Sequence, residues 1–153
     1  MNKENIVNFL RKAWPFLLTI GLWRLSGPFW NQAGFLAIIP IFYYCFARPT
    51  AWFAPFGAIM CFVIDYKFGT GCFWLALYCL MYAINGFQNI IDITRSDGNG
   101  ILIFMVFIGF GLLLLFLHNV GWWNLVDTIW MFLWTSILYT PIITLSKRVT
   151  NDR

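Results

Sequence analysis

The chain has 153 residues, of which 61% are hydrophobic, 21% are aromatic and only 10% are charged, and its mean hydropathy is +0.74. A soluble domain carries about 25% charged residues, so this composition excludes an ordinary water-soluble domain and predicts a protein of the lipid bilayer. The net charge of +4 comes mostly from basic residues at the ends of apolar segments, which indicates contact with a membrane surface and excludes nucleic acid as a partner.

The apolar segments, taken in chain order, predict about six transmembrane helices. A helix needs about 20 predominantly apolar residues to cross the hydrocarbon core of a bilayer. The predicted spans cover residues 13–30, 32–47, 51–68, 72–91, 101–117 and 122–145. The sequence therefore predicts an all-α, polytopic membrane protein with a single integral membrane domain, residues 1–153.

Charged residues and prolines mark the irregular points of these spans. Arg24 interrupts the first span and can extend its guanidinium toward the nearer interface, and the pair Gly27-Pro28 is expected to end that helix. Pro40 predicts a kink within the second span, whereas Pro141 lies near the end of the sixth. Pro55 falls in the first turns of the third span.

The distribution of basic residues predicts the orientation. Six spans place both termini on one side of the membrane, and that side receives eight of the ten Lys and Arg residues, whereas the other side receives Arg24 and Lys67. The positive-inside rule then predicts cytoplasmic termini. Tryptophans fit interfacial belts, at the inner edge Trp14 and Trp52 and at the outer edge Trp23, Trp30, Trp74, Trp122 and Trp123. Trp130 and Trp134 lie deeper, one turn apart, and are expected to pack between helices.

The third span ends in an unusual way, with Asp65 followed by the glycines Gly69 and Gly71. An acid at the edge of a hydrocarbon span is costly, which invites a functional explanation. Asp65 is either a buried group that binds a ligand or partner, or an interfacial acid that reaches water and pairs with Lys67 or Arg24. The two glycines turn the chain into the fourth span.

A second candidate contact surface lies at the inner end of the fourth span. Its polar residues fall at positions i, i+3, i+4 and i+7, which places them on one helix face: Asn85, Gln88, Asn89 and Asp92. They are either polar contacts between helices of this chain, worth about 0.6 kcal/mol each, or a docking face for another membrane protein.

The remaining polar and reactive residues do not form a recognisable catalytic or metal-binding pattern. The cysteines Cys45, Cys61, Cys72 and Cys79 lie in or at the edge of apolar spans and are interpreted as small core residues. His118 has no partner at metal-ligand spacing. Asp127 fits a helix cap or a bond to a neighbouring span as well as a catalytic acid. Gly109 and Gly111 are expected to be close-packing positions. We therefore expect no enzyme activity, no cofactor and no metal.

Three motifs in order resemble the MreD family of small integral membrane proteins of the bacterial cell-elongation machinery. The first is Arg48-Pro49 before the third span, and the second is Asp65-x-x-x-Gly69-x-Gly71. The third is the C-terminal run Leu138-Tyr139-Thr140-Pro141-Ile142-Ile143, followed by Lys147-Arg148. The chain departs from the family pattern at Cys61, where the family often has glycine, and at Thr140, which separates the tyrosine from the proline.

The resemblance covers most of the chain, and it implies a morphogenetic role. A protein similar to MreD would be a scaffold subunit for lateral peptidoglycan synthesis in the bacterial cytoplasmic (inner) membrane and would support rod cell shape. The implied partners are an MreC-like membrane protein and a RodA-like glycosyltransferase with its transpeptidase. The family has no assigned catalytic residues. The contact candidates are therefore the outer corner from Asp65 to Gly71 and the cytoplasmic face of Asn85, Gln88, Asn89 and Asp92.

Two alternatives remain. The first is a small-molecule-binding membrane subunit of a vitamin or metal uptake system, in which Asp65, Asp127 and the aromatics Trp74, Trp122 and Trp123 would line an outward-facing pocket. The second is a tryptophan-rich porphyrin or sterol receptor. That class is expected to have five spans and termini on opposite sides, which the distribution of basic residues disfavours.

Overall fold

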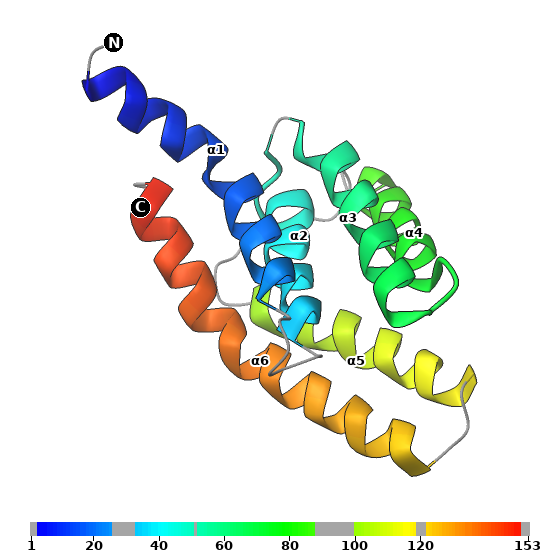
Figure 1. Cartoon of the computed structure of the whole chain (residues 1–153). Helices are drawn as coiled ribbons and strands as arrows, with labels where there is room; N and C mark the ends of the chain where they lie inside the picture. The colour runs from blue at the N-terminus through cyan, green and yellow to red at the C-terminus, as the bar shows by residue number, and fades with distance from the viewer. Residues whose placement is uncertain (1–2, 26–32, 51, 88–99, 119–121, 151–153) are drawn as a thin grey trace.

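The computed structural model describes residues 3–25, 33–50, 52–87, 100–118 and 122–150. All regular structure in these ranges is helical, which confirms the predicted all-α class (Figure 1). The elements in chain order are α1 Lys3–Arg24, η1 Ala33–Ala37, α2 Ile38–Phe42, η2 Tyr43–Ala47, α3 Phe53–Phe68, α4 Phe73–Phe87, α5 Gly100–His118 and α6 Trp122–Thr150. Because η1, α2 and η2 follow one another directly, the described residues form six helical segments, and each overlaps one of the apolar stretches predicted above.

Two of these segments are longer than expected. Helix α1 begins at Lys3, well before the predicted start at residue 13, because its first turns form an amphipathic helix that an apolar-run criterion does not detect. Helix α6 continues through Pro141 to Thr150, beyond the predicted end at residue 145. The predicted parts 26–30 and 88–91, with the Gly27-Pro28 break, lie outside the described residues.

The second helical segment, residues 33–47, changes its helix type along its length. It begins as the 3₁₀ helix η1, passes through the short α2 that contains Pro40, and ends in the π-helical turn η2. The peptide N–H of Arg48 donates to the carbonyl of Tyr43 at 2.7 Å, which closes the wider turn. Pro40 thus lies between two changes of helix type. Pro55 lies in the first turn of α3, where its missing N–H leaves no bond unmade.

The second segment is also the centre of the core. The side chains from Phe35 to Phe46 are all buried, as expected for a helix that is apolar on every side. It packs against α1, α3 and α6, and the Phe42 ring lies 5.1 Å from the ring of Phe104 on α5. The other helices therefore surround this segment.

Helices α1 and α6 lie side by side and antiparallel, so both ends of the chain lie at the same end of the molecule (Figure 1). A buried polar cluster joins them to η2. The indole N–H of Trp14 donates to the hydroxyl of Ser146 at 3.2 Å, and the hydroxyls of Tyr44 and Ser146 also form a hydrogen bond. This cluster fixes the level of α1 relative to α6.

Much of the remaining helix surface is apolar and exposed. Among the described residues, two helices are long and apolar enough to cross a membrane, over Gly100–Leu117 and Leu125–Thr150, and the apolar stretches Phe35–Ala47 and Phe73–Ile84 are shorter. Exposed apolar side chains on α5 include Leu102, Val106, Phe110 and Leu113. An apolar surface of this kind fits contact with lipid, and it indicates a membrane-associated protein.

Candidate functional site

The Asp65 corner, residues Asp65 to Leu75, joins the end of α3 to the start of α4. The Asp65 side chain is 2% exposed. Its Oδ1 atom accepts hydrogen bonds from the Thr70 hydroxyl at 2.5 Å and from the peptide N–H of Trp74 at 2.9 Å, and its Oδ2 atom accepts from the peptide N–H of Leu75 at 2.9 Å. One carboxylate therefore accepts from two peptide N–H groups at the beginning of α4 and from one hydroxyl in the connection before it.

The geometry explains why an acid is needed here. The first N–H groups of a helix have no partner within that helix, and a polar side chain just before the helix usually accepts from them. The residue before α4 is Cys72, with a φ angle of 63° and no oxygen in its side chain. The carboxylate of Asp65 supplies the missing acceptor from the preceding helix, and its negative charge favours the positive end of the α4 dipole.

Glycine allows the tight connection between the two helices. Gly69 ends α3 with a φ angle of 67°, and its N–H donates to the carbonyl of Asp65, which is the usual left-handed helix end. Gly71 also has a positive φ, 60°. The Asp65-x-x-x-Gly69-x-Gly71 motif is therefore a helix–helix corner, in which the glycines set the backbone and the acid binds the next helix.

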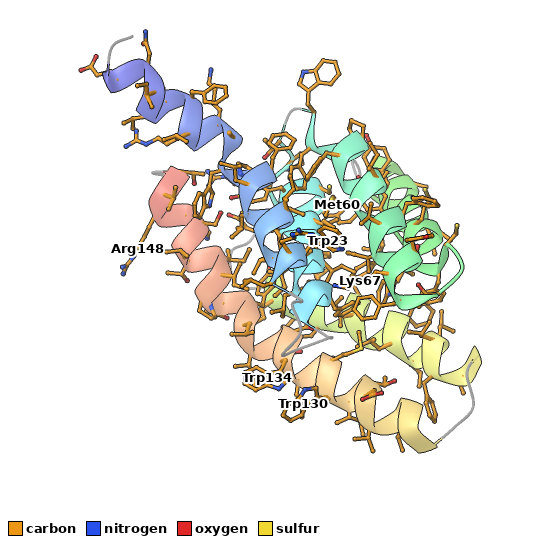
Figure 2. All side chains as sticks on the ribbon, in the orientation of Figure 1. Trp23, Met60, Lys67, Trp130, Trp134 and Arg148 are labelled. Carbon is orange, nitrogen blue, oxygen red and sulfur yellow. The ribbon has the colours of Figure 1, made fainter. Side chains whose placement is uncertain are left out.

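This geometry corrects one of the two interpretations of Asp65. An interfacial acid whose charge reaches water is wrong for this structure, because the carboxylate is buried and bonded to α4. The nearby Lys67 extends instead over the indole of Trp23, with 5.6 Å between its ammonium nitrogen and the ring centroid (Figure 2). This cation–π contact joins the end of α3 to the end of α1.

The sequence predicts that Trp74 belongs to an interfacial belt, and this prediction is wrong. Its side chain is 1% exposed, and its ring centroid lies 4.9 Å from that of Phe35 in the core. A β-carbon on Gly111 of α5 would lie 2.9 Å from the Trp74 ring, so this glycine leaves the space that the indole occupies. The bonds from Asp65 to the first turn of α4 and the absence of a side chain at Gly111 together place Trp74 inside.

The second predicted contact surface is described only at its beginning. Asn85 lies in the last turn of α4, and Gln88, Asn89 and Asp92 lie outside the described residues. The prediction of a polar face at this end of α4 therefore stays a prediction.

The prediction that Trp130 packs between helices is wrong, whereas Trp134 is half-buried on α6. Their ring centroids lie 5.6 Å apart in an edge-to-face arrangement, and Trp130 is exposed on α6 (Figure 2). Asp127 is also exposed on this helix. The apolar segment Leu125–Thr150 of α6 is long enough to cross a membrane, so lipid can accommodate the exposed indole of Trp130.

The four cysteines are free and fall into two groups. Cys45 and Cys61 are buried, as predicted, whereas Cys72 and Cys79 are exposed, so the prediction of core positions is wrong for those two. Within the described ranges, no three His, Cys, Asp or Glu side chains are placed to hold a metal ion. His118 is the last residue of α5.

A close contact that the sequence analysis missed lies between α3, α4 and η2. The Tyr78 hydroxyl donates to the carbonyl of Ala54 at 2.7 Å and lies 3.3 Å from the Cys45 sulfur. A β-carbon on Gly57 would lie 2.9 Å from that sulfur. Gly57 within an apolar helix was the available signal, because glycine destabilises a helix and allows another group to approach the backbone closely.

Comparisons with protein-family models, with curated proteins and with solved structures find no match for this chain.

Proposed function

We propose that this chain is a multi-pass protein of the bacterial cytoplasmic membrane, with both termini in the cytoplasm, that acts as a scaffold subunit of the cell-elongation complex. Six helical segments, the exposed apolar surface of α5 and α6, and the position of both chain ends at one end of the molecule support the membrane arrangement. The uneven distribution of Lys and Arg supports the orientation.

The Asp65 corner is the observation that carries this proposal. It is one of the three motifs of the resemblance to MreD, and one buried carboxylate at the end of α3 holds the start of α4 through two hydrogen bonds and the connecting Thr70 through a third. A rigid corner suits a protein that acts through contacts with other proteins and not through catalysis. Its exposed glycines, Gly69 and Gly71, leave backbone accessible to a partner at this end.

The same geometry argues against the uptake-subunit alternative. In that alternative Asp65 and Trp74 would line an outward-facing pocket. Asp65 is instead bonded to the backbone of α4, and Trp74 is packed in the core against Phe35. Neither Asp65 nor Trp74 is therefore available to line a pocket of this composition. We therefore propose the scaffold role, with an MreC-like protein and a RodA-like glycosyltransferase with its transpeptidase as partners.

The double substitution Gln88→Leu and Asn89→Leu should reduce the recovery of partner proteins with the purified chain. Each amide contact at membrane depth is worth about 0.6 kcal/mol, so losing two predicts a roughly sevenfold weaker association. Affinity purification from native membranes, followed by quantitative mass spectrometry of the co-purified proteins, measures the effect.

A matched control for this experiment is Thr140→Leu, which replaces an exposed polar residue on α6 with the same side chain. The control should retain the partners. Both variants should elute as folded protein in size-exclusion chromatography. Equal recovery of partners from the double variant and from the control would remove Gln88 and Asn89 as contact residues.

A further inference from the structure

The first turns of α1, Lys3–Lys12, extend beyond the other helices at the end of the molecule where both termini lie (Figure 1). The apolar side chains of this segment are exposed: Ile6, Val7, Leu10 and, most strongly, Phe9, which is 70% exposed. Exposure of four such side chains to water is energetically unfavourable for an extension of a membrane helix. This segment therefore needs a cover that the described chain does not provide.

The segment is amphipathic. Ile6, Phe9, Leu10 and Ala13 follow the spacing i, i+3, i+4 and i+7 and share one face of the helix. The other face carries the polar residues Glu4, Asn5, Asn8, Arg11 and Lys12. Helices with an apolar face and a polar face rich in Lys and Arg lie in the interfacial region of membranes.

The depth of this segment relative to the membrane surface follows from the contacts of α1 with α6. Trp14 bonds to Ser146, which directly precedes Lys147 and Arg148, so Arg11 and Lys12 lie at or beyond the basic end of α6. Figure 2 shows Arg148 pointing away from the helices. A helix with the 29 residues of α6 is roughly 43 Å long, against a hydrocarbon core of about 30 Å, so its basic end reaches the lipid headgroups.

We propose that Lys3–Lys12 is an interfacial helix that binds an anionic lipid surface. The face with Ile6 and Leu10 lies at the boundary between headgroups and acyl chains, and the cations of Arg11, Lys12 and Arg148 bind lipid phosphates. Charge complementarity favours lipid, and not another protein, as the partner of the apolar face. The cations beside this face lie at the depth of the lipid phosphates. This inference rests on the membrane placement in the proposed function, but not on the proposed partners.

Two labelling sites in the same turn of the helix test the proposal. The full chain, with Cys72→Ser and Cys79→Ser to remove the exposed thiols, is reconstituted in lipid nanodiscs with a nitroxide at Leu10→Cys or Asn8→Cys. Power-saturation measurements compare collisions with oxygen, which partitions into lipid, and with a water-soluble nickel chelate. A third label, Val106→Cys on the exposed face of α5, reports on membrane insertion itself.

In nanodiscs with phosphatidylglycerol, the label at position 10 should collide mainly with oxygen and the label at position 8 mainly with nickel. Each cation near an anionic surface strengthens association about fivefold. The difference between positions 10 and 8 in the ratio of oxygen to nickel collisions should therefore become much smaller in phosphatidylcholine nanodiscs. The same decrease is expected for the variant with Arg11→Gln and Lys12→Gln.

Two results would overturn the proposal while leaving the membrane placement intact, provided that the Val106→Cys label reports lipid. The first is mainly nickel collision at both positions 8 and 10, which would mean that the segment projects into water. The second is protection of position 10 from both reagents in both kinds of nanodisc, which would mean that a protein surface, such as a second copy, covers it. Nickel collision at Val106→Cys would contradict the membrane placement itself.

Discussion

Replacing Asp65 with alanine should lower the free energy of unfolding of the purified protein by at least about 3 kcal/mol. The carboxylate accepts three hydrogen bonds, two of them from peptide N–H groups at the start of α4. Bonds to a charged group contribute about 1.5–3 kcal/mol each, and the donors of Trp74 and Leu75 would lose their acceptor in a buried environment. Thermal unfolding of the detergent-solubilised protein, followed by size-exclusion chromatography, measures the loss.

The neighbouring Tyr66 provides the matched control. Its side chain is 86% exposed on the same turn of α3, so Tyr66→Ala should leave the unfolding temperature close to that of the original chain. Asp65→Asn, which keeps one acceptor oxygen but removes the charge, should fall between the two. Unchanged stability of Asp65→Ala, together with loss of partners, would contradict the structural role and make Asp65 a direct contact residue.

Substitution of Gly111 by alanine should destabilise the packing of α5 against α4 by about 1–3 kcal/mol. A β-carbon there would lie 2.8 Å from the Leu77 side chain and 2.9 Å from the Trp74 ring, closer than van der Waals contact permits. Overpacking of a buried site costs energy in this range because neighbouring side chains must leave their preferred rotamers. The same unfolding measurement detects the change.

Gly109, two residues before Gly111 on the same helix but facing α6, is the control. A β-carbon at Gly109 would lie 3.4 Å from the Phe132 ring, and alanine favours helix over glycine by about 1 kcal/mol. Gly109→Ala should therefore be neutral or slightly stabilising. Equal effects of the two substitutions would contradict the close approach of Trp74 to α5.

The helical segments could be predicted from the sequence because each one contains a long apolar stretch between polar connections. The extension of α1 to Lys3 could not be predicted in this way, since its apolar residues alternate with Asn5, Asn8 and Arg11. Helix α6 passes through Pro141 because the surrounding helix is long enough to keep the turn despite one missing bond.

The Asp65 corner was visible in the sequence as a motif, but its mechanism was not. Spacing alone does not show that a carboxylate reaches nine and ten residues ahead to Trp74 and Leu75, because that requires the left-handed turns at Gly69 and Gly71. The position of Trp74 at the end of a predicted span favours the membrane interface. Its burial depends on Gly111, which is distant in the sequence, and a single sequence does not reveal such a pairing.

Depletion of the protein in its own host cell tests the proposed scaffold role most directly. Cell shape and the fluorescent labelling of newly inserted wall material are then observed. If the protein is a scaffold of the elongation complex, depletion should give rounded cells in which new wall material is dispersed over the surface. Expression of the Gly109→Ala variant should restore rods. Unaltered shape after depletion, with growth restored by a supplied vitamin or metal, would contradict the scaffold role and favour the uptake subunit.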